Sequence, residues 1–153
     1  CVIDMSVETM ARLSKLDKII GVKDATADIS KTSLQRHTIG KEFIQLSGED
    51  MTALALMAHG GSGCISVTSN VAPRLCADLQ VACQSFDYKK ALEIQDKLIP
   101  LHKALFMETS PAPVKYALSL LGYCEDVVRL PLVSIAPDTQ AAVKDAMSHA
   151  GIL

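Results

Sequence analysis

The sequence predicts an α/β fold in which parallel strands alternate with helices ahead of a helical tail. Three short strand-like runs, at residues 18–23, 43–47 and 64–68, are separated by helical segments. Such alternation, at intervals of about 20 to 25 residues, favours parallel strands joined by helical crossovers. After Asn70 no strand-like run returns, so the remainder of the chain is predicted to be helical.

The first strand follows a short helix. Apolar residues recur at helical spacing from Ser6 to Leu16, behind a serine that can cap the helix. The run from Lys18 to Lys23 is rich in β-branched residues, has no helical period and ends abruptly in the polar segment 24–28. This pattern predicts a buried strand that delivers Lys23 to its C-terminal end.

The second helix and strand come directly afterwards. Asp28 can cap a helix that ends near Ile39, because Gly40 is a typical helix stop. Residues 43–47 are predicted to form the next strand. The segment 48–50 then turns from this strand into a third helix.

The third helix is predicted over residues 51–59 and the third strand over residues 64–68. Between them lies the glycine-rich run 60–63. A phosphate-binding loop follows its strand, whereas this run precedes one. We therefore interpret the glycines as a helix stop.

The tail carries four helical patterns, which prolines are expected to delimit because proline interrupts a helix. The patterns span residues 71–84, 87–105, 112–121 and 137–150, and the prolines are Pro100, Pro111, Pro113 and Pro131. We expect these helices to form a small helical subdomain.

The composition excludes several classes of protein. Hydrophobic residues make up 49% and charged residues 21% of the chain, which is typical of a globular protein. With 15 basic and 17 acidic residues, no basic run and 4% aromatics, nothing indicates nucleic-acid binding. No apolar stretch is long enough to span a membrane, and no signal peptide is evident.

The five cysteines are an odd number without any Cys-x-x-Cys pair. This predicts reduced thiols and a cytoplasmic protein, not a disulfide framework or a zinc site. The chain begins at Cys1 without a methionine and runs directly into Val2-Ile3-Asp4, as the interior of a longer protein would. We expect it to be part of a longer protein.

Lys23 is the first candidate for chemistry. Catalytic groups of α/β barrels lie at the C-terminal ends of the strands, which is where Lys23 is predicted. Burial among apolar strands would favour its neutral amine, the form that attacks a carbonyl to give an imine. From the spacing alone, an equally good interpretation has Lys23 in solvent or paired with Asp24 or Asp28.

Other candidates carry less weight. Gly48 could let the backbone approach a ligand closely, although Glu49 and Asp50 beside it also suit a helix N-terminus. The histidines have no spacing typical of metal ligands, and no Gly-x-Ser-x-Gly elbow indicates a serine hydrolase. No metal site is predicted.

The segment Ile19-Ile20-Gly21-Val22-Lys23-Asp24-Ala25-Thr26 closely resembles the imine-forming segment of the dihydrodipicolinate synthase family of pyruvate-dependent aldolases. Lys23 falls on the Schiff-base lysine of that family. The resemblance spans essentially the whole chain. It continues through residues 46–50, 60–73, 100–102, 111–115 and 129–131.

The resemblance implies a (β/α)8 TIM barrel followed by three helices, of which this chain holds the C-terminal half. Residues 1–86 would be a partial barrel with the last three strands, and residues 87–153 the helical subdomain. A closed barrel needs about 250 residues. The family's arginine would come immediately before Cys1, and its two threonines and tyrosine further upstream.

The resemblance also implies the reaction. Lys23 would form an imine with pyruvate, and the derived enamine would add to L-aspartate 4-semialdehyde to give 4-hydroxy-tetrahydrodipicolinate, on the pathway to diaminopimelate and lysine. The backbones of Gly48 and Ile65 would line the substrate site. No metal or organic cofactor would be required, and the enzyme would be a cytoplasmic homotetramer.

Two departures from the family pattern concern detail only: Ala27 replaces a glycine and Ser110 an asparagine. Two alternatives stay open. One is a sister aldolase, such as N-acetylneuraminate lyase or a keto-deoxy-sugar-acid aldolase, although the segments 24–26 and 47–50 favour the synthase. The other is a noncatalytic half-barrel or interaction fragment, because an open sheet edge and a half-built core invite association. This chain alone is expected to be inactive.

Overall fold

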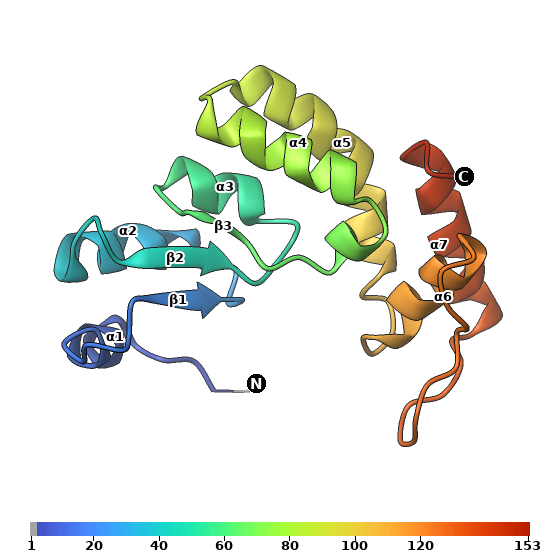
Figure 1. Cartoon of the computed structure of the whole chain (residues 1–153), viewed down its shortest axis with the longest axis horizontal. Coiled ribbons are helices and arrows are strands. Elements are labelled where there is room, and N and C mark those ends of the chain that lie inside the picture. The colour runs from blue at the N-terminus through green and yellow to red at the C-terminus, as the bar shows by residue number, and fades with distance from the viewer. Residues whose placement is uncertain (1–2) are drawn as a thin grey trace. The chain divides into compact units, whose positions relative to one another are not determined.

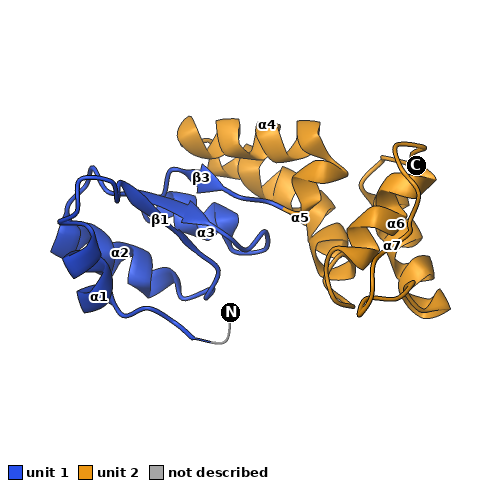
Figure 2. Ribbon diagram, turned by 60° about the horizontal axis from the view of Figure 1, so that its bottom comes forward, with its two compact units in different colours: residues 1–66 blue, residues 67–153 orange. Residues whose placement is uncertain are grey.

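The computed structural model describes residues 3–153, which form two compact units. Figure 2 shows the sheet unit, residues 1–66, and the helical unit, residues 67–153. The expected boundary between residues 86 and 87 follows the barrel of the resembled family and stays a prediction. Packing within this chain groups helix α4 (Pro73–Gln84) with the helices that follow it, because α4 packs along α5 (Tyr88–Ala104).

The sheet unit alternates helices and strands in chain order (Figure 1). Its elements are α1 (Val7–Leu13), β1 (Gly21–Asp24), α2 (Ile29–Ile39), β2 (Ile44–Ser47), α3 (Ala53–Ala58) and β3 (Gly63–Cys64). The strands form one parallel sheet in the order β1-β2-β3. The predicted parallel α/β arrangement is confirmed.

The helix ends follow the predicted capping residues. The Ser6 hydroxyl accepts a hydrogen bond from the backbone N–H of Thr9 at 3.2 Å, and Asp28 accepts one from the N–H of Ser30 at 3.0 Å. Each bond satisfies an N–H group that the first turn of a helix leaves without a partner. Gly40 ends α2 with a positive φ of 125°, a conformation that favours glycine.

Two strand predictions need correction. β1 was expected to be buried, but Lys23 is exposed and its strand neighbours are half-buried, because β1 pairs with β2 alone. The third strand was expected to reach Thr68, yet β3 ends at Cys64 and residues Thr68–Asn70 form a short 3-10 helix, η1. β2 ends at Ser47, so the chain beyond residue 65 has no strand left to pair with in this sheet.

The helical unit contains η1, α4, α5, α6 (Ala112–Leu120) and α7 (Pro137–His149). The four predicted helices are confirmed. Pro100 was expected to separate helices, but it lies inside α5. Side chains of α5 form the centre of this unit, because Leu98 and Leu101 are fully buried and α5 packs against both α4 and α7.

Replacing Leu98 with alanine tests whether α5 supplies the core of the helical unit. The Leu98 side chain is 0% exposed, so Leu98→Ala should lower the free energy of unfolding by about 2–5 kcal/mol. Leu92→Ala is the matched control on the same helix, since Leu92 is 52% exposed, and should change it by less than about 0.5 kcal/mol. Urea unfolding measures both, and equal effects would contradict this core assignment.

Candidate active site at the carboxyl edge of the sheet

The register of the sheet brings the ends of the three strands together. Lys23 pairs with Leu46, Asp24 with Ser47, and Ser47 with Cys64 on the other side. In a parallel sheet all carboxyl ends lie at one edge. The segments that follow the strands, which carry the predicted residues Gly48 and Ile65, therefore begin at the same edge as Lys23.

Lys23 and Gly48 are in close contact. A Cβ atom built at Gly48 would lie 2.6 Å from Cε of Lys23 and 3.0 Å from Cβ of Ala25. Carbon atoms do not approach so closely without displacement, so any side chain at position 48 would push the lysine away. Glycine here leaves the space through which the Lys23 side chain extends.

Backbone hydrogen bonds join the segments that follow the strands and carry Gly48 and Ile65. The backbone N–H of Gly48 donates to the carbonyl of Asp24 at 2.7 Å, and the N–H of Ile65 donates to the carbonyl of Ser47 at 2.7 Å. Since the N–H of Ile65 is engaged in this bond, its carbonyl is the backbone group it can present to a ligand. The Ile65 side chain is exposed.

The acidic pair after Gly48 has structural partners. The Glu49 carboxylate accepts hydrogen bonds from the backbone N–H groups of Met51 at 3.0 Å and Thr52 at 2.8 Å, which lead into α3. Asp50 is buried and accepts a hydrogen bond from the Ser66 hydroxyl. Glu49 therefore fixes the turn that leads into α3, whose N-cap residue Thr52 makes no side-chain cap hydrogen bond. Asp50 joins the turns after β2 and β3.

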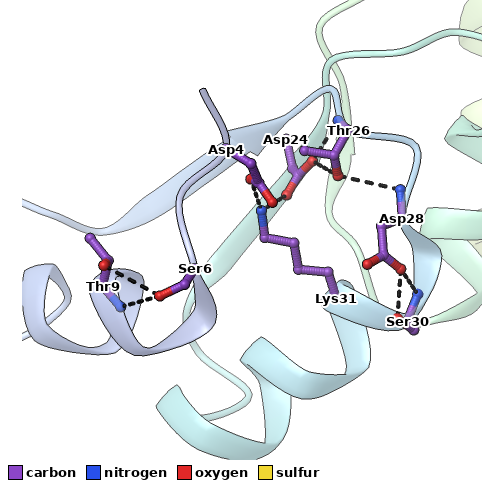
Figure 3. Close-up of polar contacts among 8 residues, drawn as sticks. All are labelled: Asp4, Ser6, Thr9, Asp24, Thr26, Asp28, Ser30 and Lys31. Atoms are coloured by element: carbon purple, nitrogen blue, oxygen red, sulfur yellow. Dashed lines mark hydrogen bonds and ion pairs between the residues drawn. The ribbon is translucent and has the colours of Figure 1, made fainter. Parts of the chain in front are cut away.

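An ion-pair network beside Lys23 was not predicted from the sequence (Figure 3). Lys31, buried in the first turn of α2, pairs with Asp4 and with the carboxylate of Asp24 at 3.1 Å. Asp24 also accepts hydrogen bonds from the N–H of Thr26 at 2.7 Å and from its hydroxyl at 2.6 Å. One signal was available: a cation is unfavourable at a helix N-terminus unless carboxylates hold it there.

These contacts shift the ionisation of both partners. Burial alone would raise the pKa of Asp24, but the hydrogen bonds from Thr26 and the pairing with Lys31 outweigh it and lower that pKa. Burial alone would lower the pKa of Lys31, whereas the bonds to Asp4 and Asp24 raise it. Both groups are therefore held in their charged forms across the neutral pH range.

An open cleft runs along this network. Its lining includes Lys23 and Asp24 of β1, Thr26 in the turn after it, the segment 3–5, and Lys31 and Gln35 of α2. Gln35 is 1% exposed, and its Nε2 has no hydrogen-bond partner among the residues that the structure describes. The cleft thus has a polar wall, to which Lys23 contributes.

Other candidate chemistry is not assembled in the described part of the chain. Residues 3–153 hold no group of three His, Cys, Asp or Glu side chains that could bind a metal ion. His59 pairs with Ser33 through Nδ1 at 2.9 Å. The cysteines at positions 83 and 124 are free thiols, and burial raises the pKa of Cys83. None of the helices described is both long and apolar enough to cross a membrane.

Parallel strands joined by helices, with a lysine at their carboxyl edge, fit part of an α/β barrel, a fold in which active sites lie at that edge. The comparison with known proteins agrees. The sequence model of the Dihydrodipicolinate synthetase family matches residues 1–150, and the chain belongs to this family.

Named relatives give the same assignment. The 4-hydroxy-tetrahydrodipicolinate synthase of Methylobacterium radiotolerans is 63% identical over 152 residues, which cover 99% of this chain and 51% of the relative. The chain therefore spans about half the length of the curated relatives it matches.

Solved structures establish the fold. The synthase of Methylacidiphilum fumariolicum superposes with a TM-score of 0.95 at 32% identity, covering 99% of this chain and 51% of that one. A dihydrodipicolinate synthase from Acinetobacter baumannii, complexed with pyruvate, gives a TM-score of 0.93 at 35% identity over 98% of this chain and 52% of that one. The sheet unit is part of a (β/α)8 barrel.

The pH dependence of stability tests the network around Asp24. Because folding lowers the pKa of this carboxyl, its contribution is present above the unfolded pKa of about 3.9 and is lost as the pH falls through the lower folded value. Asp24→Asn should have a lower free energy of unfolding than the wild type at pH 7. The difference between the two free energies should become smaller below about pH 4. Denaturant unfolding at several pH values measures this, with the exposed Asp17→Asn as control. A difference in unfolding free energy that does not change with pH would contradict the stabilising role of the Asp24 carboxylate.

Proposed function

We propose that the protein containing this chain condenses pyruvate with L-aspartate 4-semialdehyde to give 4-hydroxy-tetrahydrodipicolinate, in the biosynthesis of diaminopimelate and lysine. The observation that carries the proposal is the side chain of Lys23, which extends over Gly48 at the carboxyl edge of the sheet. Identity of 57–63% to several curated synthases over almost the whole chain supports the choice of reaction.

The proposed reaction begins with Lys23 as the nucleophile. Its neutral Nζ attacks C2 of pyruvate, and the resulting carbinolamine loses water to form a protonated imine. The imine withdraws electrons, so a methyl proton can leave and the C–H electron pair forms an enamine. No metal or organic cofactor is needed for this step, because the iminium itself is the electron sink.

Carbon–carbon bond formation follows. The enamine carbon attacks the aldehyde carbon of the semialdehyde, whose oxygen takes up a proton to become the hydroxyl group. The amino group of the second substrate then attacks the imine carbon and displaces the Lys23 amine, closing the ring. One water is released for each pair of substrates, and the enzyme is regenerated.

The backbone around Lys23 has two roles in the proposal. Gly48 provides the space for the lysine side chain and for pyruvate beside it, and the carbonyl of Ile65 lines the pyruvate site. Fixed backbone groups orient the two reactants without a conformational cost at the moment of reaction. The proton relay and the arginine that the family resemblance implies would come from the part of the barrel outside residues 1–153.

The chain by itself is proposed to be inactive. Lys23 is exposed and β1 pairs on one side only, whereas a closed barrel needs eight strands and about 250 residues. Without the other strands, water reaches the amine freely and nothing holds the second substrate. We therefore expect the condensation to take place only when the barrel is complete.

Borohydride trapping tests the imine. Treating the intact protein with pyruvate and borohydride should place a stable pyruvyl adduct on Lys23, located by peptide mass mapping, while the isolated chain should give none. Lys23→Met should abolish the adduct and reduce condensation by at least about 10³-fold, and the exposed Lys18→Met should leave both unchanged. The absence of an adduct in the intact protein would contradict the imine mechanism. An adduct without turnover of the semialdehyde would indicate a sister aldolase.

The intact enzyme is further proposed to be a cytoplasmic homotetramer, as the family resemblance implies. Light scattering on the intact protein should give four times the protomer mass, and the mass should not change on tenfold dilution in the micromolar range. A stable monomer that retains activity would contradict this proposal.

A further inference from the structure

Lys31 is a buried cation in an unfavourable place. Its side chain is 8% exposed and lies in the first turn of α2, where the helix dipole repels positive charge. A buried ammonium is tolerated only where carboxylates compensate the lost hydration. Here Asp4 and Asp24 do so, and they come from two other segments of the sheet unit (Figure 3).

Asp24 is held at its side chain and at its backbone. One carboxylate oxygen accepts two hydrogen bonds from Thr26, and the other lies 3.1 Å from Nζ of Lys31. Its carbonyl accepts the N–H of Gly48. The bonds from Thr26 are local to the turn, so Lys31 is the partner that ties the end of β1 to helix α2.

This anchoring acts on the neighbouring residue. Lys23 and Asp24 are consecutive in β1, and consecutive side chains leave a strand on opposite faces. Holding the Asp24 carboxylate on one face therefore sets the direction in which the Lys23 side chain leaves the other face. That direction carries Cε of Lys23 over Gly48, where the fit allows no additional carbon atom.

The loss of Lys31 would disturb Lys23 through the strand. The end of β1 would lose its tie to α2, so the lysine would sample more directions. A smaller fraction of the amine would then be aimed at the substrate carbonyl.

We infer that Lys31 is a positioning residue for the imine-forming lysine: through its ion pair with Asp24 it fixes the end of β1 and so aims Lys23 over Gly48. The inference rests on the proposed function, because it concerns the same amine. Lys31 touches no substrate in this scheme and acts through Asp24.

The test is the rate of pyruvyl adduct formation in the intact protein at saturating pyruvate, trapped with borohydride and compared with the melting temperature. Lys31→Met should slow trapping by at least about tenfold, whereas Lys31→Arg, which keeps the charge, should stay within about threefold of the wild type. Leu56→Ala is the control for general destabilisation. It removes buried side-chain atoms from α3, so it should lower the melting temperature while trapping stays within about twofold.

The outcomes are distinct. Trapping by Lys31→Met at the wild-type rate would overturn the inference and leave the proposed function intact, as would equal slowing in Lys31→Arg and Lys31→Met. No adduct in the wild type would instead remove the proposed function. If Lys31→Met does not fold, Asp24→Asn breaks the same pair from the other side: tenfold slowing supports the inference, and an unchanged rate overturns it.

Discussion

Parallel hydrogen bonding between β1, β2 and β3 is the constraint on which the candidate site depends. It places Lys23 opposite Leu46 and Ser47 opposite Cys64, so the segments that follow the three strands start from one edge. A shift of one residue would turn Lys23 to the opposite face of the sheet. The bonds from Gly48 to Asp24 and from Ile65 to Ser47 extend this alignment beyond the strands.

The two units of the chain differ in how they are stabilised. The helical unit has a closed core, in which fully buried leucines of α5 pack among helices. The sheet unit is open along β1, and its polar network of Asp4, Asp24 and Lys31 lies beside a cleft. In a complete barrel further strands would cover that side, which accounts for strand residues that are only half-buried here.

The acidic residues close to Lys23 in the sequence have partners other than Lys23. The acidic residues nearest in sequence do not pair with it in this structure: Asp24 binds Lys31 and Thr26, and Asp28 caps α2. The sequence had left open whether Lys23 pairs with one of them. The contacts show that both carboxylates have other partners.

The amino-acid sequence by itself determined the helix caps at Ser6 and Asp28, the parallel βα alternation and the position of Lys23 at a strand end, because these depend on local hydrogen bonding and hydrophobic periodicity. It also carried the family, through ordered motifs along the whole chain. Only the tertiary structure decided that β3 is two residues long, that Pro100 lies within a helix, and that Lys31 holds Asp24. Those features depend on which strand ends are paired and which distant side chains meet, and local sequence does not encode such contacts.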